Sequence, residues 1–131
     1  MLNPEQIGKH SIVNEHVQLG KGSKIWHFCN VYGTAEEPVI IGEDTQVGSY
    51  TQIKPHVRIG NHCRLQDHQS LPDEVTIDDF VFVAPCVTFT NDKYPDAIKT
   101  INRTYKILPT HVRSYVTIGA GAVILCGITI G

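Results

Sequence analysis

A six-residue period of aliphatic side chains is the feature that most constrains how this 131-residue chain can fold. The period covers most of the chain and is broken twice. The aliphatic positions are Ile7, Val13, Leu19 and Ile25, then Ile41, Val47, Ile53, Ile59, Leu65, Leu71, Ile77 and Val83, and finally Val112, Ile118, Ile124 and Ile130. A period of six matches neither the 3.6 residues of a helical turn nor the two-residue alternation of a half-buried strand.

Other positions within each hexad repeat as well. A small or β-branched residue usually stands four places after the aliphatic one, with Gln69 as the exception, and Gly often follows the aliphatic residue directly. A parallel β-helix accounts for this pattern if each hexad forms one wall and three hexads close one triangular coil. The aliphatic and the small residue then point inward, and the glycines relieve steric conflict where the backbone bends. We therefore expect an all-β fold of roughly sixteen hexads, or about five coils, in which residues 18 apart stack on one wall.

The two interruptions of the repeat must leave the coil as loops. Val31 and Ile41 are ten residues apart, four more than a hexad, and Phe89 and Val112 are 23 apart, which is 17 more. We therefore expect a single domain over residues 1–131, with loop excursions at about 32–40 and 89–111. Long loops on a rigid repeat scaffold usually carry function, and a loop of this length needs a surface to pack against, such as an adjacent subunit.

The composition excludes several classes of protein. A formal charge of −2 argues against a nucleic-acid partner. No apolar run approaches the ~18 residues that span a bilayer, and the polar N-terminus has no signal-peptide core. The four cysteines form no CxxC pair and are too few for a disulfide scaffold. The expectation is a cytoplasmic protein with neither a membrane nor a nucleic acid as partner.

Three segments resemble a known family. They are KIWHFC at 24–29, VTFTNDKYP at 87–95 and IGAGAVILCGITIG at 118–131. With the hexad repeat, they resemble the hexapeptide-repeat acyltransferases, which are left-handed parallel β-helices. The resemblance is greatest to the N-acetyltransferases that act on a nucleotide-linked 3-amino sugar for surface polysaccharide synthesis. It implies a left-handed coil, acetyl-CoA as co-substrate, and a homotrimer with its active site between subunits.

The chain also departs from that family. Asp96 stands where the family commonly has Arg after the loop proline, and Gln66-Asp67-His68 stands where it often reads QNN. Relatives continue past the position of Gly131 with a further coil and a C-terminal helix that help to hold acetyl-CoA. We expect that this family C-terminal part is absent here.

The reaction implied by the resemblance is attack of a sugar amine on the thioester of acetyl-CoA, which needs positioning more than a strong base. Asn91 matches the family's Asn at the sugar-amine site, where its side-chain oxygen would accept a hydrogen bond from the amine. Asn-Asp is also ordinary turn chemistry, so Asn91 alone is equally compatible with a turn. Asp92 is expected to accept a proton or to cap the turn. Tyr94 is expected to stack on the nucleotide base or to pack the loop on the coil.

Further substrate and cofactor contacts are expected elsewhere. The IWHF resemblance implies a substrate contact at His27, with corner packing against Trp26 as the alternative. Gln66 and His68 are candidate substrate contacts at mid-coil. The backbone N–H groups expected to receive pantetheine carbonyls are those around Gly119, Ala120, Cys126 and Gly127.

No metal is expected. His56, His62 and His68 follow one another at intervals of six, which places them on successive walls, and residues 18 apart would be needed to stack. The trimeric γ-carbonic anhydrases, which share the fold, show a His-x4-His pair that this chain lacks. Cys29 and Cys63 fall at the small inward position. An acyl-cysteine at Cys86 or Cys126 is disfavoured because no histidine is paired with either.

Three alternatives remain open from the sequence. One is O-acetylation of a sugar hydroxyl with His68 or His27 as base. Another is a metalloprotein like the γ-carbonic anhydrases, which stoichiometric zinc, iron or cobalt would reveal. The third is a non-catalytic, truncated relative, which failure to bind acetyl-CoA would indicate.

Overall fold

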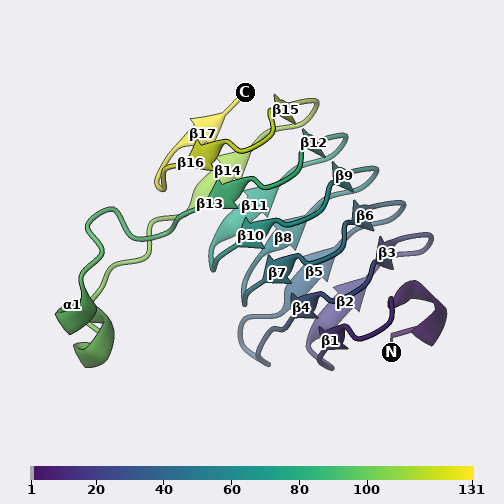
Figure 1. Cartoon of the computed structure of the whole chain (residues 1–131), viewed down its shortest axis with the longest axis horizontal. Helices are drawn as coiled ribbons and strands as arrows, with labels where there is room; N and C mark the ends of the chain where they lie inside the picture. The colour runs from purple at the N-terminus through teal and green to yellow at the C-terminus, as the bar shows by residue number, and fades with distance from the viewer. Residues whose placement is uncertain (1) are drawn as a thin grey trace.

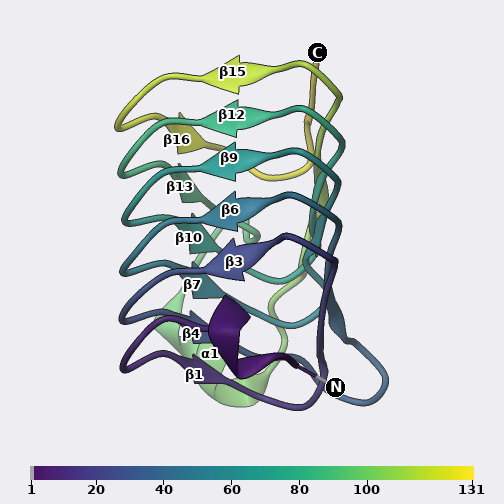
Figure 2. The same ribbon diagram turned by 90° about the vertical axis from the view of Figure 1, so that its right-hand side faces the viewer.

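A computed structural model describes residues 2–131. The chain winds through three parallel sheets in strict rotation, so that each complete coil contributes one strand to each sheet (Figures 1 and 2). We call the sheets I, II and III, and the edges where the chain passes between them I–II, II–III and III–I. The predicted all-β, left-handed parallel β-helix is confirmed. Pairs such as Ser70–Thr88 lie side by side 18 residues apart.

The strands are short, and the described residues contain seventeen of them. Sheet I contains β1 (Ile12–Val13), β4 (Asn30–Val31), β7 (Gln52–Ile53), β10 (Ser70–Leu71), β13 (Thr88–Phe89) and β16 (Val123–Ile124). Sheet II contains β2 (Val17–Leu19), β5 (Val39–Ile41), β8 (Arg58–Ile59), β11 (Val75–Ile77), β14 (Thr110–Val112) and β17 (Thr129–Ile130). Sheet III contains β3 (Lys24–Ile25), β6 (Gln46–Val47), β9 (Arg64–Leu65), β12 (Phe82–Val83) and β15 (Thr117–Ile118). A 3-10 turn, η1 (Pro4–Gln6), precedes the first strand.

The strand register accounts for both interruptions. Val17 pairs with Val39 at a separation of 22 residues, and Val75 pairs with Thr110 at a separation of 35. The excess over 18 is four residues in the first case and 17 in the second, as the repeat predicted. Both excursions leave the coil at the I–II edge. The first is shorter than the expected 32–40, because β5 already begins at Val39.

The interior is filled by the two inward positions of the hexad. Ile25, Val47 and Ile53 at the aliphatic position are fully buried, and so are Val57 and Cys63 at the small position. This apolar stack supplies the hydrophobic stabilisation of the coil, at about 25 cal/mol per Å² of buried apolar surface. Gln69, the exception in the sequence pattern, is also buried. Its Nε2 donates hydrogen bonds to the carbonyl oxygens of Gln66 and Ala84.

The sharp bend of each hexad occurs at the third residue after the aliphatic one. His56, His62 and His68 all have positive φ there, as do the aromatic residues Phe28 and Tyr50. The glycine that follows the aliphatic residue therefore does not make the bend, contrary to the sequence-based interpretation. A Cβ at such a glycine would overlap the backbone of the next coil, so the residue permits close stacking.

The long excursion forms an arm, residues 90–109, that stands off from the coil and carries α1 (Ala97–Asn102) (Figure 1). The carboxylate of Asp96 caps this helix by accepting hydrogen bonds from the N–H groups of Ile98 and Lys99, at 2.8 and 3.2 Å. Arg103 ends it in the left-handed conformation. The helix was not predicted. Within residues 2–131 no helix has the length and apolarity needed to cross a bilayer.

Candidate functional site

The structure divides the predicted site residues between two edges of the coil. Those at the I–II edge belong to the start of the arm and to the last coil: Asn91, Asp92, Tyr94, Cys126 and Gly127. Those at the III–I edge belong to three different coils: His27, Gln66, His68, Gly119 and Ala120. Sheet I separates the two groups within one chain.

The I–II edge contains a pocket of about 580 Å³ between the arm and the last coil. The arm contributes Asp92 and Tyr94 to its wall, and the last coil contributes Leu125, Cys126 and Gly127. The pocket therefore brings together residues predicted for the acceptor and residues predicted for the cofactor. Its wall is largely apolar and the charged side chains of the arm lie at one side, an arrangement that suits an apolar chain bearing a polar reacting group.

Asn91 lies at the base of the arm between two residues that line this pocket. Its backbone oxygen accepts a hydrogen bond from the N–H of Leu108 at 2.8 Å, which joins the outgoing and returning segments of the arm. Among residues 2–131 no hydrogen bond engages its side-chain amide. The carboxamide of this half-buried residue is therefore available to a ligand.

The neighbouring carboxylate has a structural role. Asp92 Oδ1 accepts a hydrogen bond from the backbone N–H of Tyr94 at 3.1 Å, which is the turn-capping alternative expected from the sequence. Tyr94 itself is 69% exposed, so its ring is not packed on the coil of its own chain.

His27 at the III–I edge is not placed as a general base. Its Nδ1 accepts the backbone N–H of Lys9 at 2.8 Å, so the neutral ring must carry its proton on Nε2 and has no free lone pair. The ring also lies edge-on to Trp26, with centroids 5.9 Å apart. This is the corner packing that the sequence left open.

His68 lies in a stack of rings that follows the III–I edge. His10, Phe28, Tyr50 and His68 succeed one another with centroids 4.9 to 5.1 Å apart and nearly parallel planes. The spacing is that of neighbouring β-strands, and stacked aromatic pairs stabilise one another in this arrangement. The stacking of His68 on Tyr50 supports this edge of the coil, and this structural role is enough to account for a histidine here.

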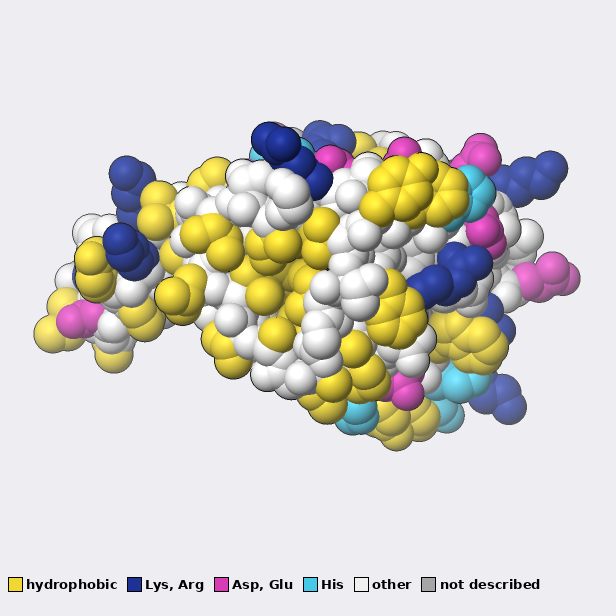
Figure 3. Space-filling view, turned by 90° about the horizontal axis from the view of Figure 1, so that it is seen from above, with side chains coloured by type: hydrophobic (Ala, Val, Ile, Leu, Met, Phe, Trp, Pro, Cys, Tyr) yellow, Lys and Arg dark blue, Asp and Glu magenta, His cyan; other side chains and the backbone are white. Residues whose placement is uncertain are grey.

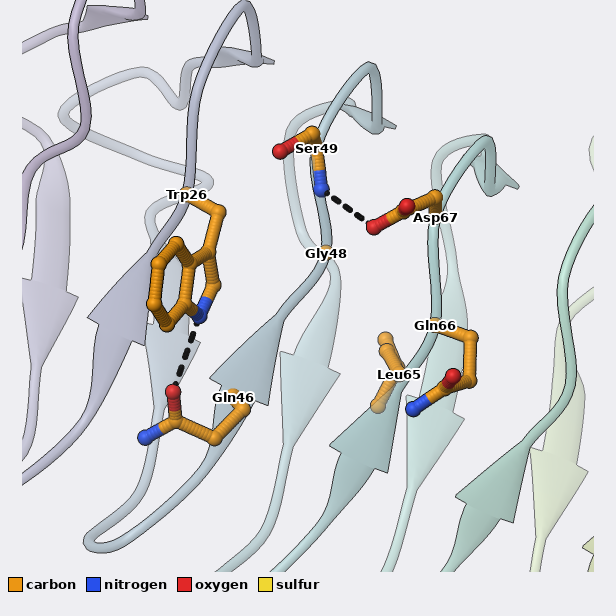
Figure 4. A pocket seen from close by; sticks show the side chains of 7 residues that line it. All are labelled: Trp26, Gln46, Gly48, Ser49, Leu65, Gln66 and Asp67. Carbon is orange, nitrogen blue, oxygen red and sulfur yellow. Dashed lines mark hydrogen bonds between the residues drawn. The ribbon is translucent and has the colours of Figure 1, made fainter.

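Gln66 lines a shallow pocket of about 300 Å³ beside Trp26 on the same edge (Figure 4). Trp26 Nε1 donates to Gln46 Oε1 at 2.9 Å, and Asp67 Oδ1 accepts the N–H of Ser49 at 2.9 Å. Asp67 therefore joins adjacent coils, while the amide of Gln66 faces the pocket.

Gly119 and Ala120 lie at the III–I edge of the last coil, one edge away from Cys126 and Gly127. The space above Gly119 is open. The four residues predicted to hold the cofactor are therefore not gathered in one place within the chain.

The sequence analysis missed a carboxylate–imidazole pair. His111 Nε2 lies 2.9 Å from Asp78 Oδ2. His111 lines a second cavity, of about 400 Å³, that shares Gly127 and Ile128 with the pocket beside the arm. The signal was present, because subtraction of the 17 extra residues of the arm places His111 next to Thr76, close to Asp78.

The cysteines offer no nucleophile paired with a histidine among residues 2–131. Burial raises the pKa of the Cys29 and Cys63 thiols, which donate to carbonyl oxygens of the next coil. Both lie at the small inward position, as predicted. Cys126 is buried beside the pocket, and Cys86 is exposed at the III–I edge.

Comparison with known proteins supports the repeat and the fold. Residues 38–68 match the family described as bacterial transferase hexapeptide (six repeats). The crystal structure of a hexapeptide transferase family protein from Anaplasma phagocytophilum superposes with a TM-score of 0.56 at 15% sequence identity. The superposition covers 95% of this chain and 71% of that one. A search of curated proteins found no match. The class defined by these findings is a left-handed β-helix that contains transferase-type hexapeptide repeats.

Proposed function

We propose that the protein is an acyltransferase that uses acetyl-CoA to N-acetylate a nucleotide-linked amino sugar for surface polysaccharide synthesis. The observation that carries this proposal is the largely apolar pocket between the arm and the last coil. Asn91 does not line it, but stands in the chain between the lining residues Thr90 and Asp92. The hexapeptide-repeat match supports the general reaction class. The resemblance of residues 87–95 to the amino-sugar enzymes supports the acceptor.

The chemistry follows from the residues of this pocket. Leu108 and Leu125 would pack against the acyl-pantetheine chain, and the backbone at Cys126 and Gly127 would receive its carbonyl groups. The Asn91 oxygen would accept a hydrogen bond from the acceptor amine and direct its lone pair at the thioester carbon. An unprotonated amine is a sufficient nucleophile once it is held in this way.

A homotrimer would complete this site. The arm carries exposed apolar side chains, with Ile98 at 67% and Ile101 at 77%, and the outer face of the last coil exposes Val123 and Leu125. Figure 3 shows hydrophobic side chains on the protruding arm and on the adjoining face. Burial of these side chains against a neighbouring copy would be favourable. It would also allow the III–I edge of one copy, with Gln66, to meet the arm of another.

The proposal is tested by the thiol released from acetyl-CoA in the presence of UDP- or dTDP-linked amino sugars. We expect release that depends on the amine, with no release when the corresponding hydroxyl sugar is offered. Measurement of mass in solution should give three chains per particle. Release with hydroxyl sugars alone would contradict N-acetylation, and a monomer at working concentration would contradict the shared site.

A second candidate is O-acetylation, favoured by one observation. The Asp78–His111 pair leaves His111 Nδ1 free beside a cavity that adjoins the acyl pocket. A hydroxyl acceptor needs such a base because it must lose its proton as it attacks. We propose His111, in place of His68 or His27, as the base for this alternative.

A further inference from the structure

We infer that Glu37, His56 and Glu74 form a binding site for a divalent transition-metal ion at the I–II edge. One ligand atom from each side chain lies within 4.8 Å of the others. His56 Nδ1 lies 2.7 Å from Glu74 Oε1 and 3.9 Å from Glu37 Oε2. All three side chains are reachable from solvent without being fully exposed to it.

The three residues come from separate segments that the coil brings together. Glu74 follows His56 by 18 residues, which is one full coil, so the two side chains stack on the same edge. Glu37 belongs to the short excursion 32–38. Its backbone oxygen accepts the N–H of His56 at 3.2 Å and the N–H of Thr34 at 3.0 Å. The bond from His56 ties the excursion to the coil, and the bond from Thr34 closes the turn within the excursion.

The local charge favours a cation. Two carboxylates face one imidazole, and within residues 2–131 neither Glu37 nor Glu74 forms an ion pair with Lys or Arg. A similar imidazole–carboxylate pair at the II–III edge is neutralised differently. Asp44 accepts from His62 at 2.9 Å, and Arg64 lies 3.3 Å from the same carboxylate. The Glu37–His56–Glu74 cluster has two acids and no such arginine.

The donor set and its dimensions suit a transition metal. Imidazole nitrogen with two carboxylate oxygens is a ligand set used for Zn²⁺ and related ions, with bonds of about 2.0 to 2.2 Å. Ligand atoms around a tetrahedral ion of that kind lie roughly 3.3 Å from one another. The His56–Glu74 distance would therefore lengthen slightly and the His56–Glu37 distance would shorten, both by rotation of glutamate side chains.

A bound ion would therefore link the short excursion to two successive coils. The expectation of no metal considered histidines alone, which diverge when they are six residues apart. The rule that residues 18 apart stack was correct, and here it selects a glutamate as the partner of His56. Three protein ligands leave a coordination position for water or another small ligand.

The test is a titration of the untagged, metal-free protein with Zn²⁺ by calorimetry and with Co²⁺ by visible absorption. We expect one ion per chain and a cobalt spectrum typical of low coordination number. Changes to residues that only support a metal ligand typically weaken binding by ~10-fold or more. Removal of a direct ligand should therefore weaken binding by at least ~10-fold. Glu37→Gln and Glu74→Gln are the variants of choice, because each retains the size of the side chain.

His62→Gln is the matched control, because His62 occupies the same hexad position as His56 and also pairs with a carboxylate, but lies at the II–III edge. It should bind as the wild type does. Thermal unfolding without metal checks that all variants are folded, and Zn²⁺ should raise the unfolding temperature of the wild type and of His62→Gln only. The inference is overturned if the wild type binds no ion at ~1 mM metal, a concentration far above the dissociation constants of structural zinc sites. It is equally overturned if Glu37→Gln and Glu74→Gln bind as tightly as the wild type.

Discussion

His111 donates its Nε2–H to Asp78 Oδ2 across 2.9 Å, which leaves Nδ1 as the ring nitrogen able to accept a proton. Because a pre-positioned amine needs little base assistance, we expect His111→Ala to slow amine acetylation by less than ~10-fold. Under the second candidate, O-acetylation, turnover of the hydroxyl acceptor should fall ~10²-fold or more on the same change. Rates of thiol release with paired amine and hydroxyl acceptors measure both. A loss of ~10²-fold with the amine would show that His111 acts as base in that reaction and would contradict our account.

Asn91→Ala should lower kcat/KM for the amino-sugar acceptor by ~10²-fold, the loss typical of a single positioned hydrogen-bonding group. The assembly should be unaffected, because the bond that joins the outgoing and returning segments of the arm uses the backbone oxygen of Asn91. Asn102→Ala, at the end of α1, provides the control on the same arm. If the Asn91 variant dissociates or unfolds, its role is structural.

Asp96→Ala removes the cap of α1 and should destabilise that helix by about 1 kcal/mol. Hydrogen exchange of the amides at 97–103 should become about fivefold faster, while exchange in the coil stays unchanged. Asp96→Asn keeps an acceptor at the cap and should restore the slower rate. Unchanged exchange in Asp96→Ala would mean that contacts other than the cap hold the helix.

Hydrogen bonds from His62 and then from Arg64 hold the pKa of the Asp44 carboxyl below its ordinary value of 3.8. A carboxyl with a lower pKa in the folded state stabilises that state while it is ionised. Its contribution is therefore complete above the unfolded-state pKa and is lost as the pH falls through the folded-state pKa.

We accordingly expect Asp44→Asn to lower the free energy of unfolding at about pH 6, and this effect to shrink as the pH falls below the unfolded-state pKa towards about pH 2. Urea unfolding at both values measures this, with Glu36→Gln as an exposed control. The difference should be small, because the group is solvated. If the difference in free energy of unfolding between the wild type and Asp44→Asn grew as the pH fell, the predicted role of the Asp44 carboxylate would be contradicted.

The fold was predictable because one constraint, the hexad, acts on nearly every residue. The position of each excursion and its number of extra residues followed from counting alone. The helix α1 could not be predicted, since six residues are too few to establish a helical period and its stability depends on a cap at Asp96. The bend at the third position after the aliphatic residue was also missed, because aromatic and histidine residues occupy a conformation usually assigned to glycine.

The site was predicted less well, for a reason that counting could have shown. Gly119 and Cys126 are seven residues apart, so they lie on different edges of the coil. The pairing of Asp78 with His111 depends on where the arm returns to the coil, which the sequence fixes only once the strand register is known.

The most direct test of the account is a calorimetric titration of the protein with acetyl-CoA. The wild type should bind, and Leu125→Glu should weaken binding by ~10-fold or more, because it places a charge on the apolar wall of the pocket. Ile12→Glu introduces the same charge at an equally exposed position at the far end of sheet I and should bind as the wild type does. Absence of binding by the wild type, or equal binding by Leu125→Glu, would contradict the assignment of this pocket to the acyl donor.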